Sequence, residues 1–180
     1  LLLRAADQAE SRGSLEAATT FLRRALEEPP PEDDVVDLLV RTAVLGGTSD
    51  GVFARQTLER AYALCTDVEQ RGEIALWLTS ALVFVGTEGE ATSFALSAVT
   101  ELPADAVDQR QALIALAKVS GWIHDLPPDR WMGELDVTPS GFGARMLAVE
   151  QAFELSLRGT DRQRMLDLLR GALDDPTWQT

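Results

Sequence analysis

The chain has 180 residues, of which 46% are apolar and 25% are charged, so it has enough apolar side chains for a sizeable buried core. Its 29 acidic and 16 basic residues give a net charge of −13. Nucleic-acid affinity comes largely from basic groups that displace counterions from phosphates, so we expect no direct binding of DNA or RNA. No run approaches the ~20 apolar residues of a membrane-spanning helix. The single cysteine, Cys65, excludes an internal disulfide framework and is typical of a reducing cytosol, so we expect a cytoplasmic protein.

The first half of the chain reads as helix and loop in turn. Small and apolar residues recur every three or four positions, as in one face of a helix, and no strand alternation interrupts them. Ser14 and either Asp33 or Asp34 are candidate N-caps, and Asp67 opens a longer helix. Prolines at 29–31 stop one helix because proline lacks the N–H and clashes with the preceding turn. The helices expected here cover residues 2–13, 15–28, 35–44, 53–64 and 67–85.

The second half continues the pattern with one irregular stretch. Residues 126–143 hold three prolines and three glycines, and we expect a linker there, with a short helix at 130–135. The regular helices expected here cover residues 89–102, 105–124, 144–157 and 161–173. Because Leu1 is followed at once by helix-forming residues and no initiator methionine is present, we expect the chain to be a piece of a longer protein. We expect residues 1–180 to form one domain.

One order of residues returns along the chain: glycine, small, large, small, proline. Gly13 is followed by Gly47, Gly86 and Gly159 at intervals that fit units of 34 to 39 residues, the last interval holding two units. Periods in this range are typical of stacked helix pairs, none of which buries its apolar face alone. About five hairpins are expected. The residues in this order are Gly13, Leu15, Ala18, Leu22, Ala25, Pro30; Gly86, Ala91, Ala95, Ala98, Pro103; and Gly159, Leu168, Gly171, Pro176, with small residues Ala6, Thr79 and Ala152 on the first helices.

These segments resemble the tetratricopeptide repeat, in which small residues let two helices approach and large ones fill the facing gap. The resemblance implies an all-α fold, a right-handed superhelix of stacked antiparallel helix pairs. The region Val35 to Phe53 departs from the pattern because its glycine loop is longer. The register of the second repeat therefore stays open.

A narrower resemblance covers nearly the whole chain. Leu3-Arg4-Ala5-Ala6-Asp7-Gln8-Ala9, with Phe21-Leu22-Arg23-Arg24-Ala25-Leu26 behind it, is similar to the start of the helical region of large ATP-binding LuxR-type (MalT-like) regulators. The resemblance implies a non-catalytic sensor or scaffold between ATPase and DNA-binding modules of a bacterial parent chain. This segment itself has no G-x-x-x-x-G-K-[ST] loop and no cofactor is expected in it. The alternative is a stand-alone peptide-binding scaffold unrelated to transcription.

Two motifs invite a catalytic or cofactor interpretation. Gly47-Thr48-Ser49-Asp50-Gly51 satisfies G-x-S-x-G, but that motif needs a strand before the serine, and a hairpin loop is the better interpretation. Gly141-Phe142-Gly143 begins like a dinucleotide fingerprint without the third glycine, and we expect a loop before a helix. His124 and Cys65 are the only histidine and cysteine, too few for a structural zinc site. We expect no enzyme activity, with Ser49 as the weak alternative.

The remaining expectation is a binding surface. The four tryptophans, at 77, 122, 131 and 178, are expected in the core, since aromatic residues at helical spacing are more often core than ligand pocket. If the repeat register holds, six apolar residues line the concave face: Leu76, Val83 and Phe84 in the third repeat, and Met146, Val149 and Phe153 in the last. An apolar groove suits an apolar inducer, an amphipathic helix or the rest of the parent protein. Uncapped terminal hairpins are expected to self-associate.

Overall fold

The computed structural model of the chain describes residues 1–28, 34–123 and 141–174. Within these residues the protein is all-helical, with nine α-helices and no strand, which confirms the predicted all-α class. The helices form two compact units, Leu1–Thr87 and Glu88–Thr180. None of the helices in the described ranges combines the length and the apolarity that crossing a membrane requires.

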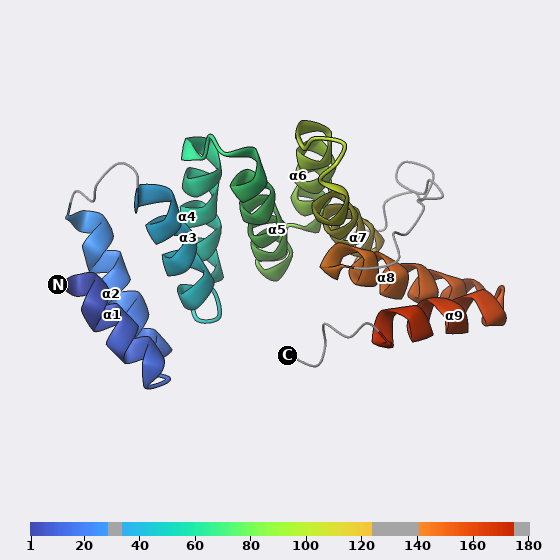
Figure 1. Cartoon of the computed structure of the whole chain (residues 1–180), viewed down its shortest axis with the longest axis horizontal. Coiled ribbons are helices and arrows are strands. Elements are labelled where there is room, and N and C mark those ends of the chain that lie inside the picture. Colours follow the sequence, from blue (N-terminus) through green and yellow to red (C-terminus); the bar gives the residue numbers. More distant parts are fainter. Residues whose placement is uncertain (29–33, 124–140, 175–180) are drawn as a thin grey trace. The chain divides into compact units, whose positions relative to one another are not determined.

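The first unit holds five helices, shown in blue to green in Figure 1. Consecutive helices pack on each other: α1 with α2, α2 with α3, α3 with α4, and α4 with α5. The bounds are α1 (Leu2–Ser11), α2 (Leu15–Glu27), α3 (Val35–Gly46), α4 (Gly51–Leu64) and α5 (Val68–Phe84).

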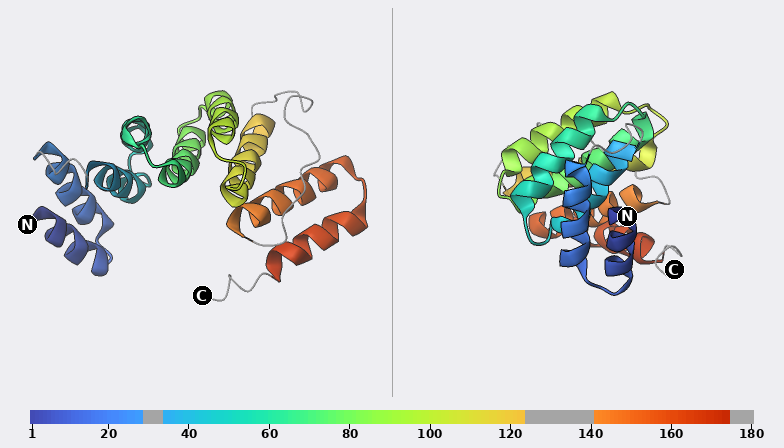
Figure 2. Two further views of the ribbon diagram at one scale, coloured as in Figure 1. Left: turned by 45° about the horizontal axis from the view of Figure 1, so that its top comes forward. Right: turned by 90° about the vertical axis from the view of Figure 1, so that its left-hand side faces the viewer.

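The second unit holds four helices, and each again packs on the next. They are α6 (Glu88–Glu101), α7 (Val107–Ile123), α8 (Phe142–Arg158) and α9 (Arg162–Leu173). Figure 2 shows α8 and α9, in orange and red, side by side and joined by a short turn. Helices α7 and α8 run in the same direction, because contacts join their beginnings at Asp108 and Gly143 and their ends at Trp122 and Phe153.

Each regular helix predicted within the described residues exists, and most of their ends fall within a few residues of the prediction, while the short helix predicted at 130–135 lies outside the described residues. Two of the predicted starts are late: α4 begins at Gly51 rather than Phe53, and α8 begins at Phe142 rather than Ala144, so the irregular stretch does not extend to Gly143. Asp67 caps α5 as predicted, its carboxylate accepting the N–H of Gln70 at 2.8 Å. Ser14 and Asp34 stand at N-cap positions, but neither side chain makes a cap hydrogen bond. His124 and residues 126–140 lie outside the described residues.

Three of the four repeat glycines end their helices with the same turn. Gly13, Gly86 and Gly159 have φ of 73°, 78° and 63°, the left-handed region that glycine adopts without a Cβ penalty. In each, the next residue donates its N–H to the carbonyl five residues back, as Thr87 does to Leu82 at 3.0 Å. Gly47 is different: its φ is −64°, and it continues the right-handed path beyond α3. Gly47 still lies between α3 and α4, as Gly13 lies between α1 and α2, so the two glycines differ in the conformation of their turns and not in their place in the helix order.

The small residues of the repeat pattern line the helix interfaces. Ala6, Ala18 and Leu22 are fully buried, and Ala25 joins them in one cluster with Leu38. The equivalent residues Thr79, Ala91, Ala95, Ala98 and Ala152 are also buried. The last helix departs from the prediction, because Gly171 is exposed and the buried small residue beside Leu168 is Ala172. At the end of α9 the buried small position is therefore one residue later than predicted, at Ala172 instead of Gly171.

Candidate functional site

An apolar hollow lies in the first unit where α3, α4 and α5 meet. Its volume is about 220 Å³, and its lining is almost wholly apolar. The lining combines small residues of α3 and α4 with two aromatic side chains of α5. We call this the α3–α5 hollow, and it is lined by Ala43, Val44, Gly47, Thr48, Gly51, Ala54, Leu58, Trp77, Ser80, Ala81 and Phe84.

Two glycines, which have no side chains, line the hollow where α3 turns into α4. A Cβ on Gly51 would stand 2.8 Å from Cδ1 of Phe84 and 2.9 Å from Cγ1 of Val85, closer than Cβ atoms are found in proteins. A Cβ on Gly47 would stand 3.0 Å from the carbonyl oxygen of Ala43. Glycine at 51 lets the end of α5 lie directly against the start of α4, while glycine at 47 lets the chain pass close to Ala43 and Ala54. The Phe84 ring then covers Gly51 on one side and remains 70% exposed on the other.

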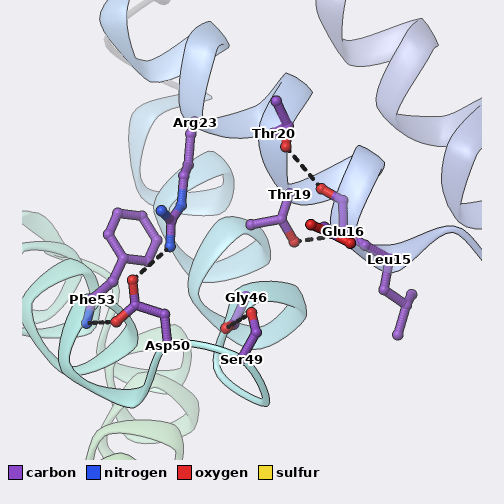
Figure 3. A network of polar contacts seen from close by, with 9 residues as sticks. All are labelled: Leu15, Glu16, Thr19, Thr20, Arg23, Gly46, Ser49, Asp50 and Phe53. Atoms are coloured by element: carbon purple, nitrogen blue, oxygen red, sulfur yellow. Dashed lines mark hydrogen bonds and ion pairs between the residues drawn. The ribbon is translucent and has the colours of Figure 1, made fainter.

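The turn below the hollow is held by a cluster of polar contacts (Figure 3). Asp50 caps α4 by accepting the N–H of Phe53 at 3.0 Å, and it also pairs with Arg23 of α2 at 3.1 Å. The Arg23 guanidinium lies 3.6 Å from the centre of the Phe53 ring, a cation–π contact. The backbone hydrogen bond from Phe53, and then the Arg23 partner, lower the pKa of Asp50. These contacts fix the start of α4, on which the hollow depends.

Charged side chains on the same helices are unevenly distributed. Arg41 of α3 points to α1 and donates to Asp7 at 2.6 Å and to Glu10 at 2.7 Å, so its charge is already neutralised there. On the side toward α5, Asp37 accepts a hydrogen bond of 2.5 Å from Gln70. Glu73 of α5 is exposed and lies one turn before Trp77 on the same face. The surface between α3 and α5 is therefore apolar at one end and acidic at the other.

The predicted concave-face residues divide between the two units. Leu76, Val83 and Phe84 lie on α5, where Leu76 and Val83 are half-buried and only Phe84 lines the hollow. The sequence did not identify Trp77, which is 49% exposed and also lines the hollow. The spacing of Trp77 and Phe84, seven residues apart on one helix face, was the available signal.

The other three predicted residues lie on α8 in the second unit. Met146 is half-buried, while Val149 and Phe153 are 49% and 52% exposed. The Phe153 ring meets Trp122 of α7 edge to face at 5.5 Å. The core expectation is therefore wrong for Trp77 and for Trp122, which is 46% exposed, because both stand on faces that the neighbouring helices leave open. Trp131 and Trp178 lie outside the described residues.

The G-x-S-x-G pattern around Ser49 lies in the turn that connects α3 to α4, as predicted. The Ser49 hydroxyl donates to the carbonyl of Gly46 at 3.0 Å, and its N–H bonds the same oxygen at 3.1 Å. A helix precedes it rather than a strand, so the strained elbow that exposes a nucleophile is missing at this position.

Cys65 ends α4 and is buried, and burial raises the pKa of its thiol. Within the described ranges, no three His, Cys, Asp or Glu side chains converge as a metal site would require.

The glycines at 141 and 143 have a packing role. Gly143 lies so close to α7 that a Cβ would overlap the carbonyl oxygen of Asp108 and stand 2.8 Å from the nitrogen of Ala112. The Asp108 carboxylate accepts the N–H groups of Gly143 at 2.8 Å and of Ala144 at 3.3 Å. Asp108 on α7 thus supplies the N-cap that Gly141, without a side chain, does not give to α8.

A buried ion cluster joins the same two helices nearer their ends. Lys118 of α7 is 3% exposed, and its Nζ lies 2.7 Å from a carboxylate oxygen of Glu150 and 3.2 Å from one of Glu154. Arg158 pairs with Glu154 from the exposed side. Desolvation by burial raises the pKa of Glu150, and the hydrogen bond from Lys118 offsets part of that effect. These paired charges all belong to α7 and α8, and we assign the cluster to the packing of the two helices.

No family model, curated protein or solved structure matches this chain.

Proposed function

We propose that the chain is a non-catalytic helical-repeat interaction domain of a LuxR-type regulator. The proposal includes a tetratricopeptide-like arrangement, with helix pairs stacked in a right-handed superhelix, and a role in relaying a partner or inducer signal to other modules of the parent. Three identical glycine turns, at intervals of 73 residues, support the repeat. The buried small residues beside them support the family pattern.

The α3–α5 hollow carries the interaction role. Two aromatic side chains stand at its edge with 49% and 70% of their surface exposed. Aromatic side chains offer about 150–250 Å² each, and burial of apolar surface is favourable by roughly 25 cal/mol per Å². Isolated exposed apolar residues are ordinary, but an apolar hollow lined by two exposed aromatic side chains is a site where a partner gains affinity.

A binding selection tests the interaction role. Helical peptides displayed as a library would be selected on the wild type and counter-selected on Trp77→Ala, whose folding is checked by circular dichroism. We expect peptides that bind the wild type and lose at least about tenfold in affinity on the variant, as a central aromatic anchor does. A selection that yields only peptides indifferent to Trp77 would reject the hollow as the binding site.

The parent gene tests the regulatory role and separates it from the alternative of a stand-alone peptide-binding scaffold. The regulator requires a P-loop upstream and a helix-turn-helix downstream in the same reading frame. Flanks with neither module would favour the scaffold. The enzyme alternative is tested with Ser49→Ala, because generic ester hydrolysis that persists unchanged in the variant does not use this serine.

A further inference from the structure

We propose that the occupant of the α3–α5 hollow is a cationic amphipathic helix, an inference that rests on the proposed interaction role. Its apolar side chain would enter the hollow, and its lysine or arginine side chains would lie over Asp37 and Glu73. Charge complementarity carries this proposal, and it is argued from the two helices that border the hollow.

The exposed acidic side chains along this surface offer negative charge to a ligand. Asp37 and Glu73 are exposed, and they stand on the helices whose later turns line the hollow. Nearby arginines already have partners: Arg41 pairs with Asp7 and Glu10, Arg23 pairs with Asp50, and the Arg71 guanidinium of α5 lies over the Tyr62 ring. An acidic partner would therefore meet two carboxylates and find no uncommitted arginine on α3 or among these pairs.

At the hollow itself, the backbone dipoles also favour positive charge. The hollow is bordered by the last turn of α3, at Ala43 and Val44, and by the last turn of α5, at Ala81 and Phe84. A helix C-terminus carries about half a negative charge. The first turn of α4 also borders the hollow and is positive, but the Asp50 carboxylate caps it. The hollow thus borders the C-termini of α3 and α5, which carry partial negative charge, and the N-terminus of α4, whose partial positive charge Asp50 neutralises.

The size of the hollow sets the apolar part of the partner. A volume of about 220 Å³ exceeds the roughly 150 Å³ of an apolar cavity that takes up benzene, so one large side chain fits. The acidic residues lie earlier on α3 and α5 than the hollow does, Asp37 by seven residues from Val44 and Glu73 by four from Trp77. Those separations correspond to one or two helical turns. A partner helix matches them when its apolar anchor stands at position i and its basic residues stand at i+4 and i+7.

The test compares three labelled helical peptides of about 15 residues with the same leucine and phenylalanine anchors. Their flanking positions carry lysine, glutamine or glutamate, and a hydrocarbon staple keeps each peptide helical, because isolated helices of this length are marginal. Binding to the whole chain would be measured by fluorescence polarisation at low and at high salt. We expect the lysine peptide to bind about tenfold more tightly than the glutamate peptide, from two exposed ion pairs, and the difference to shrink with salt.

Two charge-matched double variants locate the effect. Asp37→Asn with Glu73→Gln should remove most of the preference for lysine, and Asn at 37 keeps an acceptor for Gln70. Glu16→Gln with Glu27→Gln removes the same charge from α2 and should leave the preference unchanged. Equal affinities for the three peptides, or equal losses in the two variants, would overturn the cationic partner and leave the interaction role intact. Failure of every peptide to bind more tightly to the wild type than to Trp77→Ala would overturn both.

Discussion

Gly143→Ala is the sharpest test of how the second unit is built. The change adds one methyl group to the first turn of α8, where ordinary helix propensity favours alanine over glycine. In this structure the methyl group would overlap the carbonyl oxygen of Asp108 and lie 2.8 Å from the nitrogen of Ala112. Both atoms belong to the backbone of α7, so no side-chain rotation relieves the overlap, and the two helices must separate by on the order of 1 Å.

The expected magnitude follows from two losses. Forcing an extra methyl group into a packed interface costs about 1–3 kcal/mol. Separation of the helices also lengthens the hydrogen bonds of 2.8 Å and 3.3 Å by which Asp108 caps α8. Loss of an N-cap costs about 1 kcal/mol. Together the free energy of unfolding should fall by about 2–4 kcal/mol, which lowers Tm by at least about 8 °C for a unit of this size.

The assay is thermal unfolding by calorimetry, with hydrogen exchange to locate the effect. Exchange should increase in α7 and α8 and stay unchanged in α1 to α4. The matched control is Gly171→Ala in α9, where an added Cβ meets nothing within 4 Å. That variant should gain about 0.5–1 kcal/mol, because glycine in a helix costs conformational entropy. If Gly143→Ala is as stable as the wild type, or if both variants change stability in the same direction, the close approach of α7 and α8 is not as described.

Three further predictions concern single polar groups. Asp108→Ala should lower the free energy of unfolding in urea by about 1 kcal/mol because α8 loses its cap, while Asp108→Asn keeps an acceptor and should lose less; equal losses would contradict the capping role. Burial raises the pKa of Glu150 and the hydrogen bond from Lys118 offsets only part of that effect, so the folded protein takes up this proton more readily than the unfolded chain does. The contribution of Glu150 to stability is therefore full below the ordinary pKa of 4.5 and is lost as pH rises through the raised value. Glu150→Gln should remove that decline in unfolding free energies measured between pH 4 and pH 8, and parallel curves for the two proteins would refute it. Cys65 is 2% exposed and has a raised pKa, so a disulfide reagent at pH 8 should label it slowly until urea unfolds the chain; fast labelling of the folded protein would show that the thiol is accessible.

The helices and several of their caps could be predicted from the sequence because their signals are local. Asp67 caps α5 where the sequence places it, and α8 ends at Arg158, just before Gly159 and within one residue of the predicted end. Helix caps and glycine turns depend on residues at most five positions away. The turn at Ser49 could be predicted for the same reason, since the helix before it already excludes a strand.

The site could be predicted only in part, because facing residues on different helices carry no local signal. Phe84, which the sequence placed in a binding surface, lines the hollow, whereas Trp77, which also lines it, was assigned to the core. Periodicity shows that a residue belongs to an apolar stripe, and it does not show whether a neighbouring helix covers that part of the stripe. Gly47 shows the same limit, because only its φ of −64° distinguishes it from the glycines that end repeats.

By itself, the sequence determined an all-helical chain with recurring glycine turns, small residues at helix interfaces and an acidic balance. These properties come from the order of neighbouring residues and from composition. Only the tertiary structure decided which aromatic side chains stay exposed, that Asp108 caps a helix 35 residues away, and that Gly51 lies directly against Phe84 of α5 beside the hollow. Each of these depends on the distance between helices, which side chains far apart in the sequence set together when they pack.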